Sequence, residues 1–129
     1  MSTGDETPPP EEHESPSRTA LVVDDDDGFR RTLEIWLEDD GWTVLEATDG
    51  REGLERLDRT VDVLAVDRRM PILSGDELVE RVSTREFDGA VVVLSADRPD
   101  EYLDEALVDA YLQKPVDRVE VLEALAEHE

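Results

Sequence analysis

Short apolar runs alternate along most of the chain with longer segments in which apolar residues recur at helical spacing. The runs are rich in Val and Leu, a composition typical of strands that are buried on both faces of a parallel sheet. They comprise Ala20–Val23, Thr43–Ala47, Val61–Val66, Ala90–Leu94 and Ala110–Leu112. The pattern therefore predicts five strands, each separated from the next by a polar or amphipathic segment.

The segments between the runs predict helices. After the first run, four apolar residues share one helical face: Phe29, Leu33, Trp36 and Leu37. A second helix is expected after Gly50, and a third after Ser74, which forms a capping-box pattern with Glu77. We expect a fourth, weaker helix over Asp100–Val108. Its inward residues are expected to be Tyr102, Leu103, Ala106 and Leu107. Those of the last helix are expected to be Val119, Leu122, Leu125 and Ala126.

Repeated strand–helix units predict a doubly wound α/β fold, in which a parallel sheet carries helices on both faces. Ligands bind to such sheets beyond the carboxyl ends of the strands, where the strand order reverses. The residues that directly follow the apolar runs are therefore the candidates for a functional site. They are Asp24 and Asp25 after the first run, Asp67 after the third, Ser95 after the fourth and Lys114 after the fifth.

These residue types together indicate phosphoryl chemistry at one edge of the sheet. Clustered carboxylates repel one another, and Mg²⁺, which binds carboxylates, water and phosphate oxygens, relieves that repulsion. A lysine supplies the counter-charge for a phosphoryl group, and a hydroxyl donates a hydrogen bond to it. The set fits phosphoryl transfer to or from a carboxylate. The next acidic residues, Asp26 and Asp27, are expected instead to begin a helix, where acidic side chains favour the positive end of the helix dipole.

The composition indicates which partners and which cellular location to expect. The 129 residues carry a formal net charge of -23, and of the 13 basic residues only Lys114 is a lysine. Such a surface repels nucleic acids and anionic membranes, so we expect no direct binding to either. It resembles the surfaces of proteins from salt-loving organisms. The chain has no cysteine and no apolar stretch long enough to span a membrane, so we expect a cytoplasmic protein.

The chain divides near residue 18. Residues 1–18 are rich in Pro, Ser, Thr and Glu and contain no aliphatic residue after Met1. Such a segment cannot bury enough apolar area to offset the entropy of ordering it. We interpret it as a disordered, acidic and Pro-rich tail, and we expect the folded domain to comprise residues 19–129.

Four stretches of the sequence resemble the motifs of response-regulator receiver domains of two-component signalling. They are LVVDDDDGFRRTL, LAVDRRMPILSGDEL, VVVLSA and AYLQKP. The second stretch is most similar to receivers of halophilic archaea. The resemblance covers residues 19–129 and implies the flavodoxin-like (βα)5 fold, a doubly wound, five-stranded parallel sheet with strand order 2-1-3-4-5.

The resemblance also implies roles for individual residues. Asp67 would accept a phosphoryl group from a sensor histidine kinase or a phosphotransfer protein. Asp25 and Asp67 would bind Mg²⁺ directly, together with the backbone carbonyl of Arg69. Asp24 would assist the binding of the ion through water.

Three further residues take roles by the same resemblance. Ser95 and Lys114 would contact the phosphoryl oxygens. Tyr111 matches the aromatic residue that changes rotamer on activation, and the switch would therefore consist of Ser95 and Tyr111. Pro115 would follow a cis peptide bond.

The resemblance implies a phosphorylation-dependent switch that catalyses its own phosphotransfer and slow dephosphorylation, not an enzyme with an external substrate. The signal would leave through the surface formed by the fourth helix, the fifth strand and the last helix, including Tyr102, Tyr111 and Val121. This surface would contact one of three things: an unknown partner, an output domain, or a second copy of the chain in a phosphorylation-dependent homodimer.

Two features depart from the common receiver pattern. Arg68 and Arg69 directly follow Asp67, where many receivers have less cationic residues. An Arg69 side chain that reached over the acyl phosphate would alter the lifetime of the phosphoryl group. Ser95 stands where threonine is common, and it keeps the hydroxyl without the methyl group, so a looser switch is expected.

Two other classes compete with the receiver interpretation. Asp25–Gly28 resembles the opening motif of phosphatases of the haloacid dehalogenase type, but Phe29 stands where that motif has threonine, and Asp67 is left unexplained. The same stretch resembles a calcium-binding loop, but Val23 would occupy the first ligand position and cannot bind the ion. A receiver that no longer accepts phosphate is a third alternative, although all the key residues are present.

Overall fold

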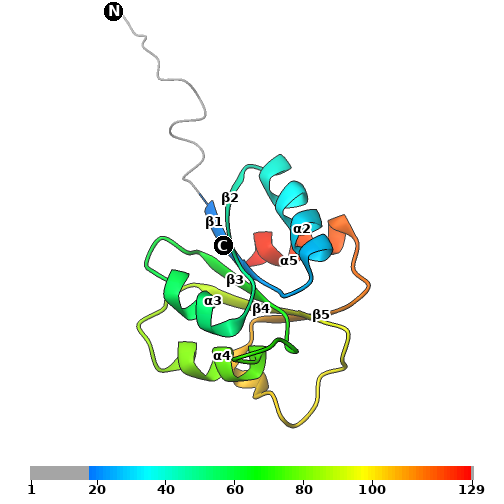
Figure 1. Cartoon of the computed structure of the whole chain (residues 1–129). Helices are drawn as coiled ribbons and strands as arrows, with labels where there is room; N and C mark the ends of the chain where they lie inside the picture. Colours follow the sequence, from blue (N-terminus) through cyan, green and yellow to red (C-terminus); the bar gives the residue numbers. More distant parts are fainter. Residues whose placement is uncertain (1–17, 129) are drawn as a thin grey trace, which may run out of the picture.

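The sheet has five parallel strands, and the computed structural model describes residues 18–128 (Figure 1). The strands are β1 (Arg18–Val23), β2 (Trp42–Ala47), β3 (Val63–Val66), β4 (Ala90–Ser95) and β5 (Ala110–Gln113). Their order in the sheet is β2-β1-β3-β4-β5, so the direction in which strands are added to the sheet reverses at β1, next to β3. The predicted flavodoxin-like topology is confirmed.

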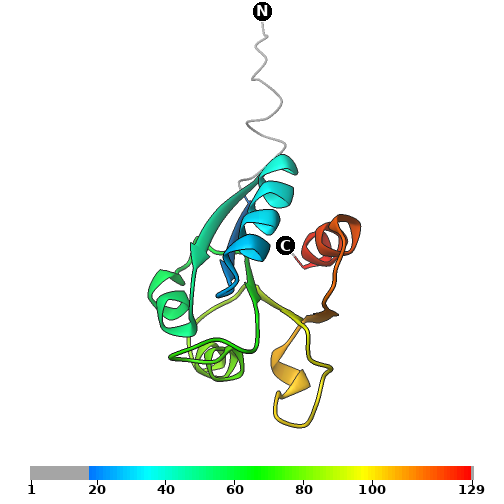
Figure 2. The same ribbon diagram turned by 45° about the vertical axis from the view of Figure 1, so that its right-hand side comes forward.

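Within residues 18–128, four α-helices and one 3-10 helix connect or follow the strands. They are α2 (Asp27–Asp39), α3 (Gly50–Arg56), α4 (Gly75–Ser83), the 3-10 helix η2 (Glu105–Leu107) and α5 (Arg118–Glu127). Figure 2 shows α2 and α5 on one side of the sheet and α3 and α4 on the other. The sheet therefore has a separate apolar core on each face.

Alternate residues of β1 divide between these two cores, because successive side chains of a strand point to opposite faces of the sheet. Leu21 and Val23 belong to the core under α3 and α4. Ala20 and Val22 belong to the core under α2 and α5. Burial on both faces explains why β1 reads as a continuous apolar run.

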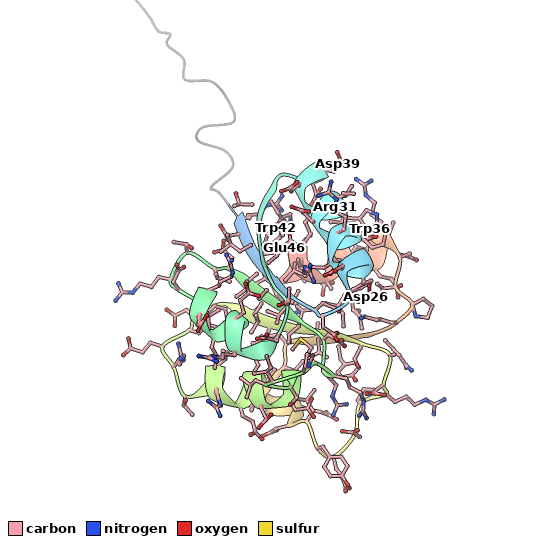
Figure 3. All side chains as sticks on the ribbon, viewed as in Figure 1. Asp26, Arg31, Trp36, Asp39, Trp42 and Glu46 are labelled. Atoms are coloured by element: carbon pink, nitrogen blue, oxygen red, sulfur yellow. The ribbon has the colours of Figure 1, made fainter. Side chains whose placement is uncertain are left out.

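Side-chain caps fix where the helices begin. Asp26 is the N-cap of α2, and its carboxylate accepts a hydrogen bond from the backbone N–H of Phe29 (Figure 3). Ser74 and Glu77 form the expected capping box at the start of α4. These caps satisfy backbone donors that a helix leaves free at its first turn. The start of α2 also places Asp24 and Asp25 just before the helix, at the end of β1.

The expected helix over Asp100–Val108 is wrong, because only the three residues of η2 are helical in this segment. The acidic side chains of this segment bond to nearby backbone groups instead. Asp100 accepts a hydrogen bond from the N–H of Tyr102, and Asp104 accepts one from the N–H of Ala106. Such local bonds compete with a continuous helix.

The burial of residues 100–108 also differs from the pattern expected for a helix. Leu103 is buried as predicted, and Leu107 is half-buried. Tyr102 is instead 74% exposed, and Ala106 is also exposed. A segment that is not helical does not place these residues on one inward face.

The buried stripe of α5 agrees with the prediction only in part. Leu125 is buried and Leu122 half-buried as predicted, but Val119 is 61% exposed, Ala126 is exposed, and Val121 and Ala124 are buried instead. With 3.6 residues per turn, Val121 lies about 200° around the helix from Val119, so both cannot face the sheet. Val121 therefore cannot belong to an exposed output surface.

The tail expected over residues 1–18 lies outside the described residues, except for Arg18, which begins β1. Among residues 18–128, no helix combines the length and the apolar character that crossing a bilayer requires.

Candidate functional site

Three aspartates meet at the carboxyl ends of β1 and β3. One carboxylate oxygen from each of Asp24, Asp25 and Asp67 lies within 4.8 Å of the other two. Asp24 is 2% exposed and Asp67 is 9% exposed, while Asp25 faces solvent. The order of the strands explains this meeting, because β1 and β3 are neighbours in the sheet although their carboxyl ends, Val23 and Val66, lie 43 positions apart in the sequence.

Lys114 places its ammonium group against these carboxylates from the end of β5. Its Nζ lies 3.0 Å from Oδ2 of Asp24 and 3.9 Å from Oδ1 of Asp67. The same Nζ lies over the ring of Phe29, 4.1 Å from the ring centroid. The Lys114–Pro115 peptide bond is cis, as the resemblance implied. Sequence reasoning treated Phe29 as a core residue and missed this cation–π contact.

The environment of Asp67 disfavours a negative charge there. Burial, and next the charge of Asp24, raise the pKa of Asp67 to about 6, although the charge of Lys114 and the N–H of Arg68 act in the opposite direction. A divalent cation would offset this repulsion, and carboxylate oxygens are the ligands that Mg²⁺ prefers. The donor set of Asp24, Asp25 and Asp67 therefore fits a Mg²⁺ ion.

The backbone around Asp67 is packed closely against the start of α4. The N–H of Asp67 donates to the carbonyl of Val23, and the N–H of Gly75 donates to the carbonyl of Arg68. A Cβ atom at position 75 would lie 1.9 Å from the carbonyl oxygen of Asp67. Only glycine fits this close approach, so Gly75 fixes how the chain returns to Asp67.

Ser95 and Arg69 both connect to Asp97, which lies two residues after the end of β4. Ser95 is 1% exposed, and its Oγ accepts a hydrogen bond from the N–H of Asp97 at 3.1 Å. The exposed guanidinium of Arg69 pairs with the carboxylate of Asp97. The Arg69 side chain is therefore directed to Asp97, which we did not anticipate from the sequence.

Tyr111 lies on the α4 side of the sheet, half-buried against the core there. Its hydroxyl donates to the carbonyl of Asp97 at 2.6 Å and accepts a bond from Nη1 of Arg68 at 3.3 Å. Arg68 is itself only 6% exposed. Sequence reasoning noted Arg68 as a departure from the receiver pattern but did not find its contact with Tyr111. No sequence spacing signals this contact, since 43 residues separate the two.

The comparisons with known proteins agree with this geometry. The profile of the family described as "Response regulator receiver domain" matches residues 20–126. The chain belongs to the response-regulator receiver family. Receiver domains are signalling switches that take phosphoryl groups from histidine kinases and bind Mg²⁺ at an acidic pocket.

Individual relatives support the assignment. The receiver is 41% identical over 116 residues to a "Putative transcriptional regulator" of Haloferax volcanii, covering 90% of this chain and 20% of that protein. This similarity confirms the resemblance to halophilic archaeal receivers. The receiver is also 32% identical over 113 residues to "Chemotaxis protein CheY" of Treponema pallidum, covering 82% of this chain and 78% of that protein.

The structural comparison gives the same fold. The structure of the chemotaxis protein CheY4 of Vibrio cholerae matches with a TM-score of 0.78 and 27% identity, covering 87% of this chain and 98% of that one. The receiver spans only 20%, 27% and 45% of the length of three curated relatives. These relatives therefore contain further segments that the receiver does not match.

Proposed function

We propose that this receiver domain takes a phosphoryl group from the phosphohistidine of a sensor histidine kinase, or of a phosphotransfer protein, onto the carboxylate of Asp67. The observation that supports this most strongly is the meeting of Asp67 with two further carboxylates and the ammonium group of Lys114. In the step, an oxygen of Asp67 forms a bond to phosphorus while the phosphorus–nitrogen bond to the histidine breaks. The histidine leaves as an imidazole.

Each neighbouring residue has a role in this proposal. A Mg²⁺ ion would be held by Asp24, Asp25 and Asp67 and by the backbone carbonyl of Arg69. The ion would supply positive charge to the carboxylates and to the phosphoryl oxygens. Lys114 neutralises part of the charge that the phosphoryl group brings. Because Lys114 is fixed by Asp24, its ammonium group is already in place before the phosphoryl group arrives.

We further propose that Ser95 and Tyr111 pass the signal from the site to β5. The Ser95 hydroxyl would donate a hydrogen bond to a phosphoryl oxygen. The N–H of Asp97 bonds to the same hydroxyl oxygen, so the segment between β4 and η2 would follow this movement. The Tyr111 hydroxyl donates a hydrogen bond to the carbonyl of Asp97. Phosphorylation would therefore stabilise the position that the Tyr111 ring occupies in this structure. The surface around η2 and β5 would then contact an unknown output partner or a second copy of the chain.

The geometry does not support the phosphatase and calcium-loop interpretations of the acidic residues Asp24–Asp27. Asp26 caps α2, and the carboxylate of Asp27 pairs with Arg30. Asp27 would be the second aspartate of the motif in the phosphatase alternative and a ligand in the calcium-loop alternative. The side chains of Asp26 and Asp27 instead stabilise the start of a helix, as expected from the sequence.

Incubation with acetyl phosphate, a small phosphoryl donor, tests the proposal. The wild-type protein should gain one phosphoryl group in the presence of Mg²⁺ and none after the ion is chelated. Asp67→Asn should abolish the gain. Asp88→Asn is the matched control, because Asp88 is an exposed aspartate outside the site, and it should behave as wild type. Retention of labelling in Asp67→Asn would contradict the proposal.

A further inference from the structure

Arg68 joins three segments of the chain through a buried guanidinium group. Its Nε and Nη2 donate to the two carboxylate oxygens of Asp76, each at 2.8 Å. Its Nη2 also donates to Oδ1 of Asp100 at 2.8 Å. A two-pronged arginine–carboxylate pair fixes the orientation of the guanidinium plane as well as its position. The guanidinium is thus held between the first turn of α4 and the segment that precedes η2.

The remaining nitrogen of this guanidinium points to Tyr111. Nη1 donates to the hydroxyl of Tyr111 at 3.3 Å and to the carbonyl of Arg98 at 3.2 Å. The Tyr111 hydroxyl in turn donates to the carbonyl of Asp97. The hydroxyl therefore lies between one donor and one acceptor, and both bonds require the ring to stay turned toward the α4 side of the sheet. We call this the inward position of Tyr111.

The groups that hold the Arg68 guanidinium do not include the carboxylate of Asp67. Hydrogen bonding to Asp76 is the main cause that raises the pKa of Arg68, and hydrogen bonding to Arg68 is the main cause that lowers the pKa of Asp100. The contact between Arg68 and Tyr111 therefore has anchors, Asp76 and Asp100, that are distinct from the carboxylate of Asp67.

Arg68 nevertheless touches the acceptor through its backbone. Its N–H donates to Oδ1 of Asp67 at 2.8 Å. One residue thus contacts the acceptor carboxylate with its main chain and the tyrosine hydroxyl with its side chain.

We propose that Arg68 is a positioning residue that holds Tyr111 inward whether or not Asp67 carries a phosphoryl group. The inward position is then the major one before any phosphoryl transfer. A phosphoryl group adds to a preference that already exists, and removal of Arg68 makes the inward position depend on the phosphoryl group. This proposal concerns the position of one ring, and it holds or fails independently of whether Asp67 is the acceptor.

NMR spectroscopy of the Tyr111 ring tests the proposal. The chain has two tyrosines, so a Tyr102→Phe background leaves one labelled ring to follow. In this background, NOEs between the Tyr111 ring and methyl groups of the core under α4 should be strong without any additive. They should change little when beryllofluoride, a phosphoryl mimic, is added with Mg²⁺.

Arg68→Gln should lower the ratio of inward to outward rings about tenfold or more, because a hydrogen bond from a charged group is lost. Beryllofluoride should restore part of it. Arg31→Gln is the matched control, since Arg31 is exposed on α2 and pairs only with a neighbouring glutamate among the described contacts. This control should give the wild-type NOEs.

Two further variants keep the test decisive if Arg68→Gln does not fold. Arg68→Lys keeps the charge but loses the planar fork and should give an intermediate inward population. Asp100→Asn removes an exposed anchor of the guanidinium and should lower the population in the same direction, by less than Arg68→Gln. Wild-type NOEs in Asp100→Asn and Arg68→Lys, or NOEs that appear in the Tyr102→Phe parent only with beryllofluoride, would overturn the proposal.

Discussion

The ammonium group of Lys114 is shared by two carboxylates from different strand ends, at 3.0 Å from Asp24 and 3.9 Å from Asp67. The shorter contact is made to the more deeply buried aspartate, since the Asp24 side chain is only 3% exposed. Lys114 is therefore part of the structure of the site as well as a contact for an incoming phosphoryl group.

Lys114→Ala should destabilise the Mg²⁺-free protein by roughly 3 kcal/mol, because it leaves the buried Asp24 carboxylate without its partner. Added Mg²⁺ should recover much of the loss by supplying positive charge to the same carboxylates. Urea denaturation with and without Mg²⁺ measures both effects. The exposed pair of Arg118 and Asp39 offers the control, and Arg118→Ala should change the free energy of unfolding by less than about 1 kcal/mol. An equal loss in the two variants would contradict this role of Lys114.

Asp67→Asn should stabilise the Mg²⁺-free protein at neutral pH. Because burial and Asp24 raise the pKa of Asp67 from 3.8 to about 6, the folded state holds this proton more tightly than the unfolded state does. The resulting penalty is fully present above pH 6 and disappears as the pH falls through the range from about 6 to 3.8. The gain in Asp67→Asn should thus be at most about 3 kcal/mol at pH 7.5 and vanish near pH 4. Thermal denaturation across this range measures it, and a gain independent of pH would be inconsistent with the raised pKa.

Asp25→Asn should weaken Mg²⁺ binding more than Asp24→Asn does. Both oxygens of Asp24 already accept bonds, Oδ1 from the N–H of Asp26 and Oδ2 from Lys114. Asp25 faces solvent beside them and is the more accessible ligand. Isothermal titration with Mg²⁺ compares the two variants, and a larger loss of affinity in Asp24→Asn would contradict this order.

Gly75→Ala should destabilise the protein by roughly 3 kcal/mol or more, because its Cβ would lie 1.9 Å from the carbonyl oxygen of Asp67. Gly28→Ala is the matched control. A Cβ at position 28 meets its nearest atom, in the Asp26 carboxylate, at 3.4 Å, and alanine favours a helix by up to about 1 kcal/mol over glycine. Gly28→Ala should therefore be neutral or stabilising in chemical denaturation. Similar stabilities of the two variants would show that the close approach at Gly75 can relax.

The sheet and the acidic site were predictable because both depend on local signals. A strand buried on both faces must be apolar along its whole length, as in Val63–Val66. The carboxyl ends of parallel strands meet at one edge, so Asp24 and Asp67 can be placed together without knowing any side-chain contact. Lys114 followed from the same rule.

The segment between β4 and β5 was not predictable in this way. Its apolar spacing suggested a helix, but Asp100 and Asp104 bond to nearby backbone N–H groups, and apolar spacing carries no signal of such local bonds. The contacts among Arg68, Asp100 and Tyr111 depend on how this irregular segment packs. Such contacts between residues far apart in the sequence have no periodic signal.

Reduction of the phosphorylated protein with borohydride tests the central claim most directly. Borohydride converts an aspartyl phosphate to homoserine and leaves free carboxylates unchanged, so peptide mass spectrometry then reads which aspartate carried the phosphoryl group. After incubation with acetyl phosphate and Mg²⁺, we predict a homoserine in place of Asp67 and at no other position. A homoserine in place of Asp25 with Asp67 unchanged, or no conversion at any aspartate, would contradict the account.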